Sequence, residues 1–346
     1  MRVKSIDVIK GLTILSVINM HTCFWSGTLY LPNYCRSLSL FWDVPVFFFI
    51  AGFLSASIPN AGNSFIHIAR QSMKILRDFL IVITFCLVAS TIYLAVINPH
   101  MIFTYKFINA ALSAILFGSG GILLAPWRVL PGSYWFIVIY FKLLLTVPAY
   151  YLVRENVKRR PMLILALCYW FLVLLTDRTF LFYMPLFWLG FIYKIKPGIL
   201  SPLIAIIISV LLFVALGIWI FIIKAIPDFS IYKSHASLPY LIIALQPILI
   251  LTILQQLEEE GKISYHGFLS NFLQWAGRNS LRIYLWEAVC TSLPYFYIPI
   301  CKTQMSPLSL YGINLVMSFA LSVIAVRLHE IYLEKFKTIR ILENQL

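Results

Sequence analysis

Three ionisable side chains near the N-terminus stand where chemistry could occur inside a membrane. The stretch IDVIKGLTILSVINMHTCFW (residues 6–25) is apolar apart from a few polar residues, among them Asp7, Lys10 and His21. A charged side chain at the centre of a membrane helix costs roughly 2.5–3.5 kcal/mol on insertion scales. In a helix, Lys10 and His21 lie within roughly 20° of each other and about 16 Å apart along the axis. Asp7 lies within about 60° of Lys10, so we expect one polar stripe that faces protein rather than lipid.

The histidine of this stripe suits proton transfer. An imidazole titrates near neutral pH, so His21 could take a proton from a hydroxyl. No Cys, His or Glu stands at metal-ligand spacing from it, and the six cysteines are scattered without a CxxC pair, so no metal site is predicted. Two structural alternatives stay open. His21 could be a hydrogen-bonded core residue, and Asp7, Lys10 and Glu287 could form an ion-pair network between helices.

The composition places this stripe in a membrane protein. The chain has 346 residues, of which 61% are hydrophobic and 12% are charged, and its mean hydropathy is +0.89. A soluble domain of this length could not cover so much apolar surface. Several runs contain the 18 or more apolar residues that cross a bilayer. We therefore predict an all-α polytopic membrane protein, with one domain over residues 1–346 and no soluble domain.

Ten transmembrane helices are predicted, and the basic residues orient them. The net charge is +14, but Lys and Arg cluster in short loops between spans, which indicates a membrane surface rather than nucleic acid. With the N-terminus in the cytoplasm, the inner segments hold eighteen of these residues and the outer segments six, so both termini are predicted to be cytoplasmic. The glycine-broken stretch 107–126 is placed as a re-entrant or surface segment, because a span there would reverse every later loop. The predicted spans are 6–25, 39–58, 78–97, 134–153, 161–177, 179–195, 199–223, 238–256, 281–300 and 311–331.

Depth along these spans sorts the polar side chains into two predicted layers. The layer near the cytoplasm contains Asp7, Lys10 and Glu287. The outer layer contains His21, Asp43 and Lys142, with Trp135 at the outer end of the fourth span. For Asp43 and Lys142 a structural or loop-facing role is the alternative, and Trp135 could be an interface anchor.

Five motifs in order along the chain resemble the acyltransferase-3 family of integral membrane acyltransferases. The first is a basic residue, ten intervening residues and a histidine, within SIDVIKGLTILSVINMH; here Lys10 stands where arginine is usual. The second to fifth motifs are VPVFFFIAGF (44–53), GSYWFI (132–137), MPLFWLGF (184–191) and NSLRIYLWE (279–287). In the fifth, Glu287 stands where histidine is frequent.

The resemblance implies about ten transmembrane helices in a bacterial cytoplasmic (inner) membrane, and transfer of an acyl group, usually acetyl, from acyl-CoA. The acceptor would be a carbohydrate or lipid-linked saccharide, and acyl-CoA would be a substrate rather than a tightly bound cofactor. Lys10 and His21 correspond to the catalytic residues of the family. We expect Asp43 to orient the imidazole, and the basic loop with Arg154, Lys158, Arg159 and Arg160 to attract the donor phosphates.

Two other classes of function remain as alternatives at this stage. A membrane exporter of a saccharide or lipid-linked glycan would explain the polar stripe but needs no histidine. A non-catalytic membrane scaffold would need nothing from His21. Consumption of the acyl-CoA thioester distinguishes the acyltransferase from both.

Overall fold

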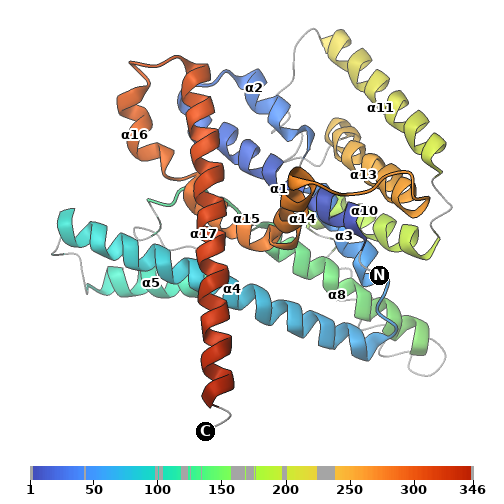
Figure 1. Cartoon of the computed structure of the whole chain (residues 1–346), viewed down its shortest axis with the longest axis horizontal. Coiled ribbons are helices and arrows are strands. Elements are labelled where there is room, and N and C mark those ends of the chain that lie inside the picture. The colour runs from blue at the N-terminus through green and yellow to red at the C-terminus, as the bar shows by residue number, and fades with distance from the viewer. Residues whose placement is uncertain are drawn as a thin grey trace. The chain divides into compact units, whose positions relative to one another are not determined.

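The chain is helical throughout the part that the computed structural model describes, and no strand occurs there (Figure 1). The described residues are 3–42, 44–97, 100, 104–117, 124, 126–133, 135–156, 168, 175, 177–196, 201–223 and 238–343.

The helices vary greatly in length, from single turns to 37 residues. In chain order they are α1 (Lys4–Phe24), η1 (Ser26–Leu29), α2 (Asn33–Leu38), η2 (Ser39–Phe41), α3 (Pro45–Ser55), α4 (Ala61–Ile97), α5 (Tyr105–Phe117), α7 (Val129–Ser133), α8 (Trp135–Asn156), α10 (Arg178–Ile195), α11 (Pro202–Ile223), α13 (Leu238–Glu259), α14 (Phe268–Arg278), α15 (Ser280–Cys290), α16 (Pro294–Cys301) and α17 (Pro307–Glu343).

Within the described residues, six helical segments are long and apolar enough to cross a membrane. Six of the predicted spans lie largely within them, and together they support a multi-pass membrane protein. The segments are Lys4–Leu29, Ala61–Ile97, Val129–Arg154, Pro202–Ile222, Pro239–Glu259 and Pro307–Lys335.

Of the remaining predicted spans, 39–58 and 281–300 are each divided between two helices, whereas 179–195 is continuous. Span 39–58 contains η2 and the 11-residue helix α3, and span 179–195 corresponds to α10. Span 281–300 is broken at residues 291–293, because Pro294 has no N–H to continue α15 and instead begins α16. Span 161–177 lies almost entirely outside the described residues. Of 107–126, α5 describes residues up to Phe117, and 118–123 lie outside them.

The chain forms two compact units. The first contains residues 1–17, 32–76 and 134–278, and the second contains 18–31, 77–133 and 279–346. The last residues of α1 and most of α4 therefore belong to the second unit.

Glycines allow close helix packing in the first unit. A Cβ on Gly52 of α3 would overlap the carbonyl oxygen of Phe187 in α10, and one on Gly190 of α10 would overlap that of Phe49 in α3. Small residues at such contacts let helix backbones approach within a membrane. The two family-like motifs of these helices are thus packed directly against each other.

The start of α1 contacts two other helices of the first unit, α14 and α13. A Cβ on Gly11 would overlap the carbonyl oxygen of Leu273 in α14, and one on Gly277 of α14 would overlap the carbonyl oxygen of Asp7. The Glu258 carboxylate of α13 accepts hydrogen bonds from the first backbone N–H groups of α1, at 3.0 and 2.8 Å. A carboxylate is favourable there because the N-terminal N–H groups of a helix lack partners within the helix.

In the second unit, α15 packs against α17 and α7 (Figure 1). The Tyr284 hydroxyl donates to the carbonyl oxygen of Ser133 at 2.5 Å, and the Ser292 hydroxyl accepts from the N–H of Val129 at 3.1 Å. These buried hydrogen bonds hold the middle of α15 and the turn that follows it against the segment 129–133. The position of α15 matters because it carries Glu287.

Candidate active site

His21 and Glu287 form a buried pair in the second unit. His21 lies in the last turn of α1, and its Nδ1 is 2.8 Å from Oε1 of Glu287 on α15. The His21 side chain keeps 9% of its surface exposed, and that of Glu287 keeps none. Oε2 of Glu287 has no hydrogen-bond partner among the described residues. A fully buried carboxylate is costly unless it is paired, so this glutamate depends on the histidine.

Neighbouring side chains hold the two partners in place. Two residues before His21, the Asn19 side chain accepts a hydrogen bond from the Tyr311 hydroxyl of α17. Asn314 of α17 donates to the Tyr30 hydroxyl at 2.8 Å. On the other side, the Tyr284 ring lies 6.4 Å from the His21 ring. The last residues of α1 are therefore fastened to α17, and α15 presents its carboxylate to them.

The geometry of the pair suits general-base chemistry. An ionised carboxylate only accepts hydrogen bonds, so His21 donates from Nδ1 and its lone pair lies on Nε2. A carboxylate that holds one nitrogen in this way fixes the tautomer and stabilises the imidazolium that forms when the other nitrogen takes a proton. The arrangement can therefore remove a proton at Nε2 and return it later.

This pair corrects the prediction of two separate polar layers. Glu287 was expected near the cytoplasm and His21 in the outer half, yet their side chains are in contact. The depth of Glu287 was counted along a continuous span 281–300, but α15 ends at Cys290. An 11-residue helix covers only about 16 Å, so counting residues along it does not give membrane depth.

Lys10 and Asp7 lie on α1 within the first unit. Asp7 is buried and Lys10 is half-buried, as expected for a stripe that faces protein. His21 follows on the same helix but belongs to the second unit.

Lys142 and Trp135 have local packing roles in the first unit. Lys142 Nζ lies 2.6 Å from Oδ2 of Asp177, whose other oxygen accepts from the first N–H groups of α10. This contact supports the structural alternative for Lys142. Trp135 stacks on Tyr183 of α10, with ring centroids 5.8 Å apart. Asp43, expected to orient His21, lies outside the described residues.

The predicted donor-binding loop is described only in part. Arg154 is exposed in the last turn of α8. Lys158, Arg159 and Arg160 lie outside the described residues. Among the described residues, no group of three His, Cys, Asp or Glu side chains could hold a metal ion.

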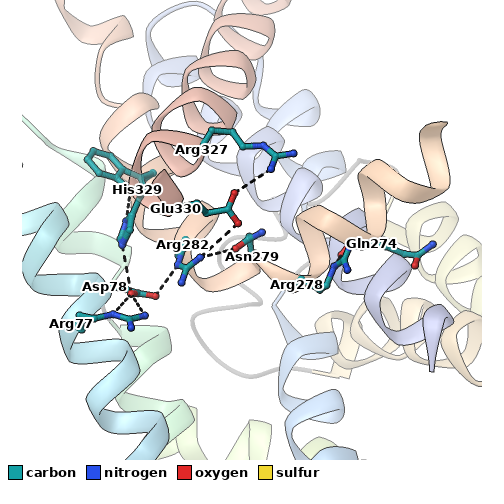
Figure 2. A network of polar contacts seen from close by, with 10 residues as sticks. Arg77, Asp78, Gln274, Arg278, Asn279, Arg282, Arg327, His329 and Glu330 are labelled. Atoms are coloured by element: carbon teal, nitrogen blue, oxygen red, sulfur yellow. Dashed lines mark hydrogen bonds and ion pairs between the residues drawn. The ribbon is translucent and has the colours of Figure 1, made fainter. Parts of the chain in front are cut away.

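A second polar cluster, which the sequence pattern does not predict, has Asp78 of α4 as its central residue (Figure 2). Its Oδ1 accepts from Arg77 at 2.9 and 2.7 Å, and its Oδ2 accepts from Nε of Arg282 in α15 at 3.2 Å. His329 Nε2 of α17 lies 3.6 Å from Asp78, and its Nδ1 accepts from Trp286 Nε1 at 3.0 Å. The spacing of Arg77 and Asp78 gave no signal of this cluster, because its partners come from distant helices.

Six helices long and apolar enough to cross a membrane, together with a buried histidine–carboxylate pair, are what the described residues of this multi-pass membrane protein show. A family model described as an acyltransferase domain matches residues 3–327 of this chain. The chain therefore belongs to the acyltransferase-3 family, which confirms the resemblance seen in the five motifs. Both members of the His21–Glu287 pair lie within the match. No curated protein and no solved structure gives a significant match.

Proposed function

We propose that this protein transfers an acyl group, most simply acetyl, from acyl-CoA to a hydroxyl of a cell-surface polysaccharide or its lipid-linked precursor. Membership of the acyltransferase-3 family supports acyl transfer in a membrane. The buried contact between His21 Nδ1 and Glu287 Oε1 is the observation from which we propose where the reaction takes place. It gives the chain a base that suits deprotonation of a hydroxyl.

In the proposed reaction, Nε2 of His21 takes the proton of the acceptor hydroxyl as its oxygen attacks the thioester carbonyl carbon. A C–O ester bond forms, the C–S bond of the thioester breaks, and the proton passes from His21 to the departing sulfur. Glu287 stabilises the imidazolium between these two transfers. An assisted proton transfer of this kind supplies about 10²–10⁴ in rate.

The donor would approach from the cytoplasmic side of a bacterial inner membrane. The basic segments assigned to that side, including Arg154 and the loop 157–160, would attract its phosphates. Lys10 keeps a positive charge on the helix that leads to His21, where it could contact the donor on its way to the site. Both termini are cytoplasmic in this arrangement, as the distribution of Lys and Arg indicates.

His21→Gln is the variant that tests the proposal. His21→Ala would leave the buried Glu287 carboxylate unpaired, whereas the glutamine amide can donate to it and keep the fold. Glutamine cannot take a proton at neutral pH, so glycan acylation should fall by about 10²–10⁴. The matched control is His266→Gln, at an exposed histidine, which should be fully active.

Two measurements decide the outcome. Acyl-CoA thioester consumption is followed in membrane vesicles with acceptor, and the acetyl content of the glycan is measured by NMR in cells. Normal acylation by His21→Gln would reduce His21 to a structural residue. Glycan movement across the vesicle membrane without thioester consumption would favour an exporter instead. Thiol release in the absence of acceptor, one equivalent per protein, would show that His21 carries the acyl group covalently.

A further inference from the structure

An apolar groove opens on the surface of the second unit. Its volume is about 480 Å³, and it is lined by one face of α17, parts of α4 and α15, and the side chains of Trp127 and Leu293. The side chains of Phe85, Ile324 and Leu328 are 48–62% exposed, so the groove is open along its length. The lining residues are Ile81, Phe85, Trp127, Trp286, Val289, Cys290, Leu293, Leu321, Ile324, Ala325, Leu328, His329 and Tyr332.

The charge pattern places one end of this groove at the membrane surface. In α17, residues 307–326 carry no charged side chain and extend about 30 Å, which matches the hydrocarbon core. The first charge after this stretch is Arg327. In α4, residues 79–97 are equally free of charge, and Asp78 and Arg77 precede them. The lining residues 321–325 thus lie at hydrocarbon depth, and 328–332 lie at the boundary with the headgroups.

The polar cluster around Asp78 stands at this boundary end of the groove, because His329 belongs to both (Figure 2). Glu330 joins the cluster, with Oε2 3.3 Å from Arg327 and Oε1 3.8 Å from Arg282. Three guanidinium groups and two carboxylates take part in these contacts. The Arg77 side chain keeps 44% of its surface exposed and stands four residues before the lining residue Ile81, so it can contact a further anion at this end of the groove.

We propose that this groove is a binding site for an anionic phospholipid. One acyl chain lies along the apolar face of α17 between Leu321 and Leu328, and the phosphate contacts Arg77, which lies one turn before the lining residue Ile81 on α4. An apolar chain joined to an anion is the ligand that matches both ends of the site, and the surrounding membrane supplies it. Guanidinium groups are well suited to phosphate because they present several N–H donors in one plane. The site does not depend on the acyl transfer proposed above.

Native mass spectrometry of the purified protein tests this proposal. Phosphatidylglycerol and phosphatidylcholine are added in detergent, and the bound lipid is counted. The wild-type protein should retain phosphatidylglycerol in preference. Arg77→Gln should lower that retention about fivefold, the factor expected of one basic side chain at an anionic surface, and leave phosphatidylcholine unchanged. The control Lys335→Gln removes an exposed charge of α17 outside the groove and should have no effect.

Two further variants test whether the apolar lining of the groove binds the acyl chain of the lipid. Ala325→Phe fills the groove and should abolish retention of both lipids, whereas Val316→Phe, at an exposed position of α17 outside the lining, should not. If Ala325→Phe fails to fold, Leu328→Asn places a polar group at an exposed lining position and should lower retention in the same way. Equal retention by the wild type and these variants overturns the site. Equal loss in Arg77→Gln and Lys335→Gln, or no preference between the lipids, overturns its anionic part.

Discussion

Replacing Glu287 by glutamine probes the proposed base without changing the space around it. Glutamine has nearly the same volume and keeps an oxygen that can accept from His21 Nδ1, but it removes the negative charge. That charge matters while His21 holds the proton of the acceptor. A hydrogen bond to a charged group contributes about 1.5–3 kcal/mol, and about 1.36 kcal/mol is a factor of ten in rate. Acyl transfer should therefore slow by about 10- to 160-fold.

The assay is thiol release from acyl-CoA by purified protein with a saturating glycan acceptor. The turnover number should fall, while KM for the donor stays the same because Glu287 contacts His21 and not the donor. The thermal unfolding temperature should not fall, since a buried amide costs less to desolvate than a buried carboxylate. The matched control is Glu260→Gln, whose carboxylate is exposed and paired with Lys262 at 2.6 Å.

A rate within twofold of wild type for Glu287→Gln would refute this reasoning, provided that His21→Gln is inactive in the same assay. The base would then act without help from its carboxylate partner. A fall of equal size in Glu260→Gln would also refute it, because surface charge rather than the buried pair would be responsible.

Three further predictions concern α1, the contact between α3 and α10, and α17. Lys10→Ala should strongly reduce acyl transfer and Lys10→Arg should retain most of it, because the positive charge is the property proposed to act. Loss of protein abundance rather than of activity would favour an ion-pair role for Lys10. Gly52→Ala should lower the unfolding temperature, since its Cβ would overlap backbone of α10, while Gly217→Ala, with nothing within 4 Å, should be neutral or stabilising by up to about 1 kcal/mol. Reporter fusions should read as cytoplasmic after residue 340 and as outside after residue 305; the same side for both would show that α17 does not cross the membrane.

The class of fold could be predicted from composition because the bilayer permits few solutions. Long apolar runs must be helical in lipid, so six of the predicted spans fall in helices long enough to cross. The break after α15 was also present in the sequence. Pro294 lies inside the predicted span 281–300 and removes a backbone N–H donor there. The span was nevertheless predicted as continuous, because the apolar run is long enough to cross a membrane.

The two partners of the active site were identified, but their contact was not. The spacing of Lys10 and His21 shows which residues share a face of α1, because that depends on one helix alone. Spacing says nothing of a partner 266 positions away. Asp43 was expected to orient the imidazole by analogy with other carboxylate–histidine pairs, and it lies outside the described residues. The depth assigned to Glu287 did not predict its contact with His21, because α15 is a short helix.

The Asp78 cluster could not have been found by counting charges along spans. Asp78 stands at the edge of the predicted span 78–97, where a carboxylate beside an arginine is typical of a wet loop. Its side chain is nevertheless fully buried, because α4 begins at Ala61 and residues from α15 and α17 cover it. Burial of this carboxylate is tolerated because two guanidiniums and one imidazole surround it.

The short helix α15 connects this cluster with the active site. Trp286 donates to His329, and the next residue, Glu287, contacts His21. Consecutive helical residues point about 100° apart, so one turn of α15 is held from two directions. Since 11 residues supply little helical stability of their own, these contacts and the Tyr284–Ser133 hydrogen bond determine where the carboxylate lies. The precision of the His21–Glu287 pair therefore depends on α4 and α17 as much as on the two residues that form it.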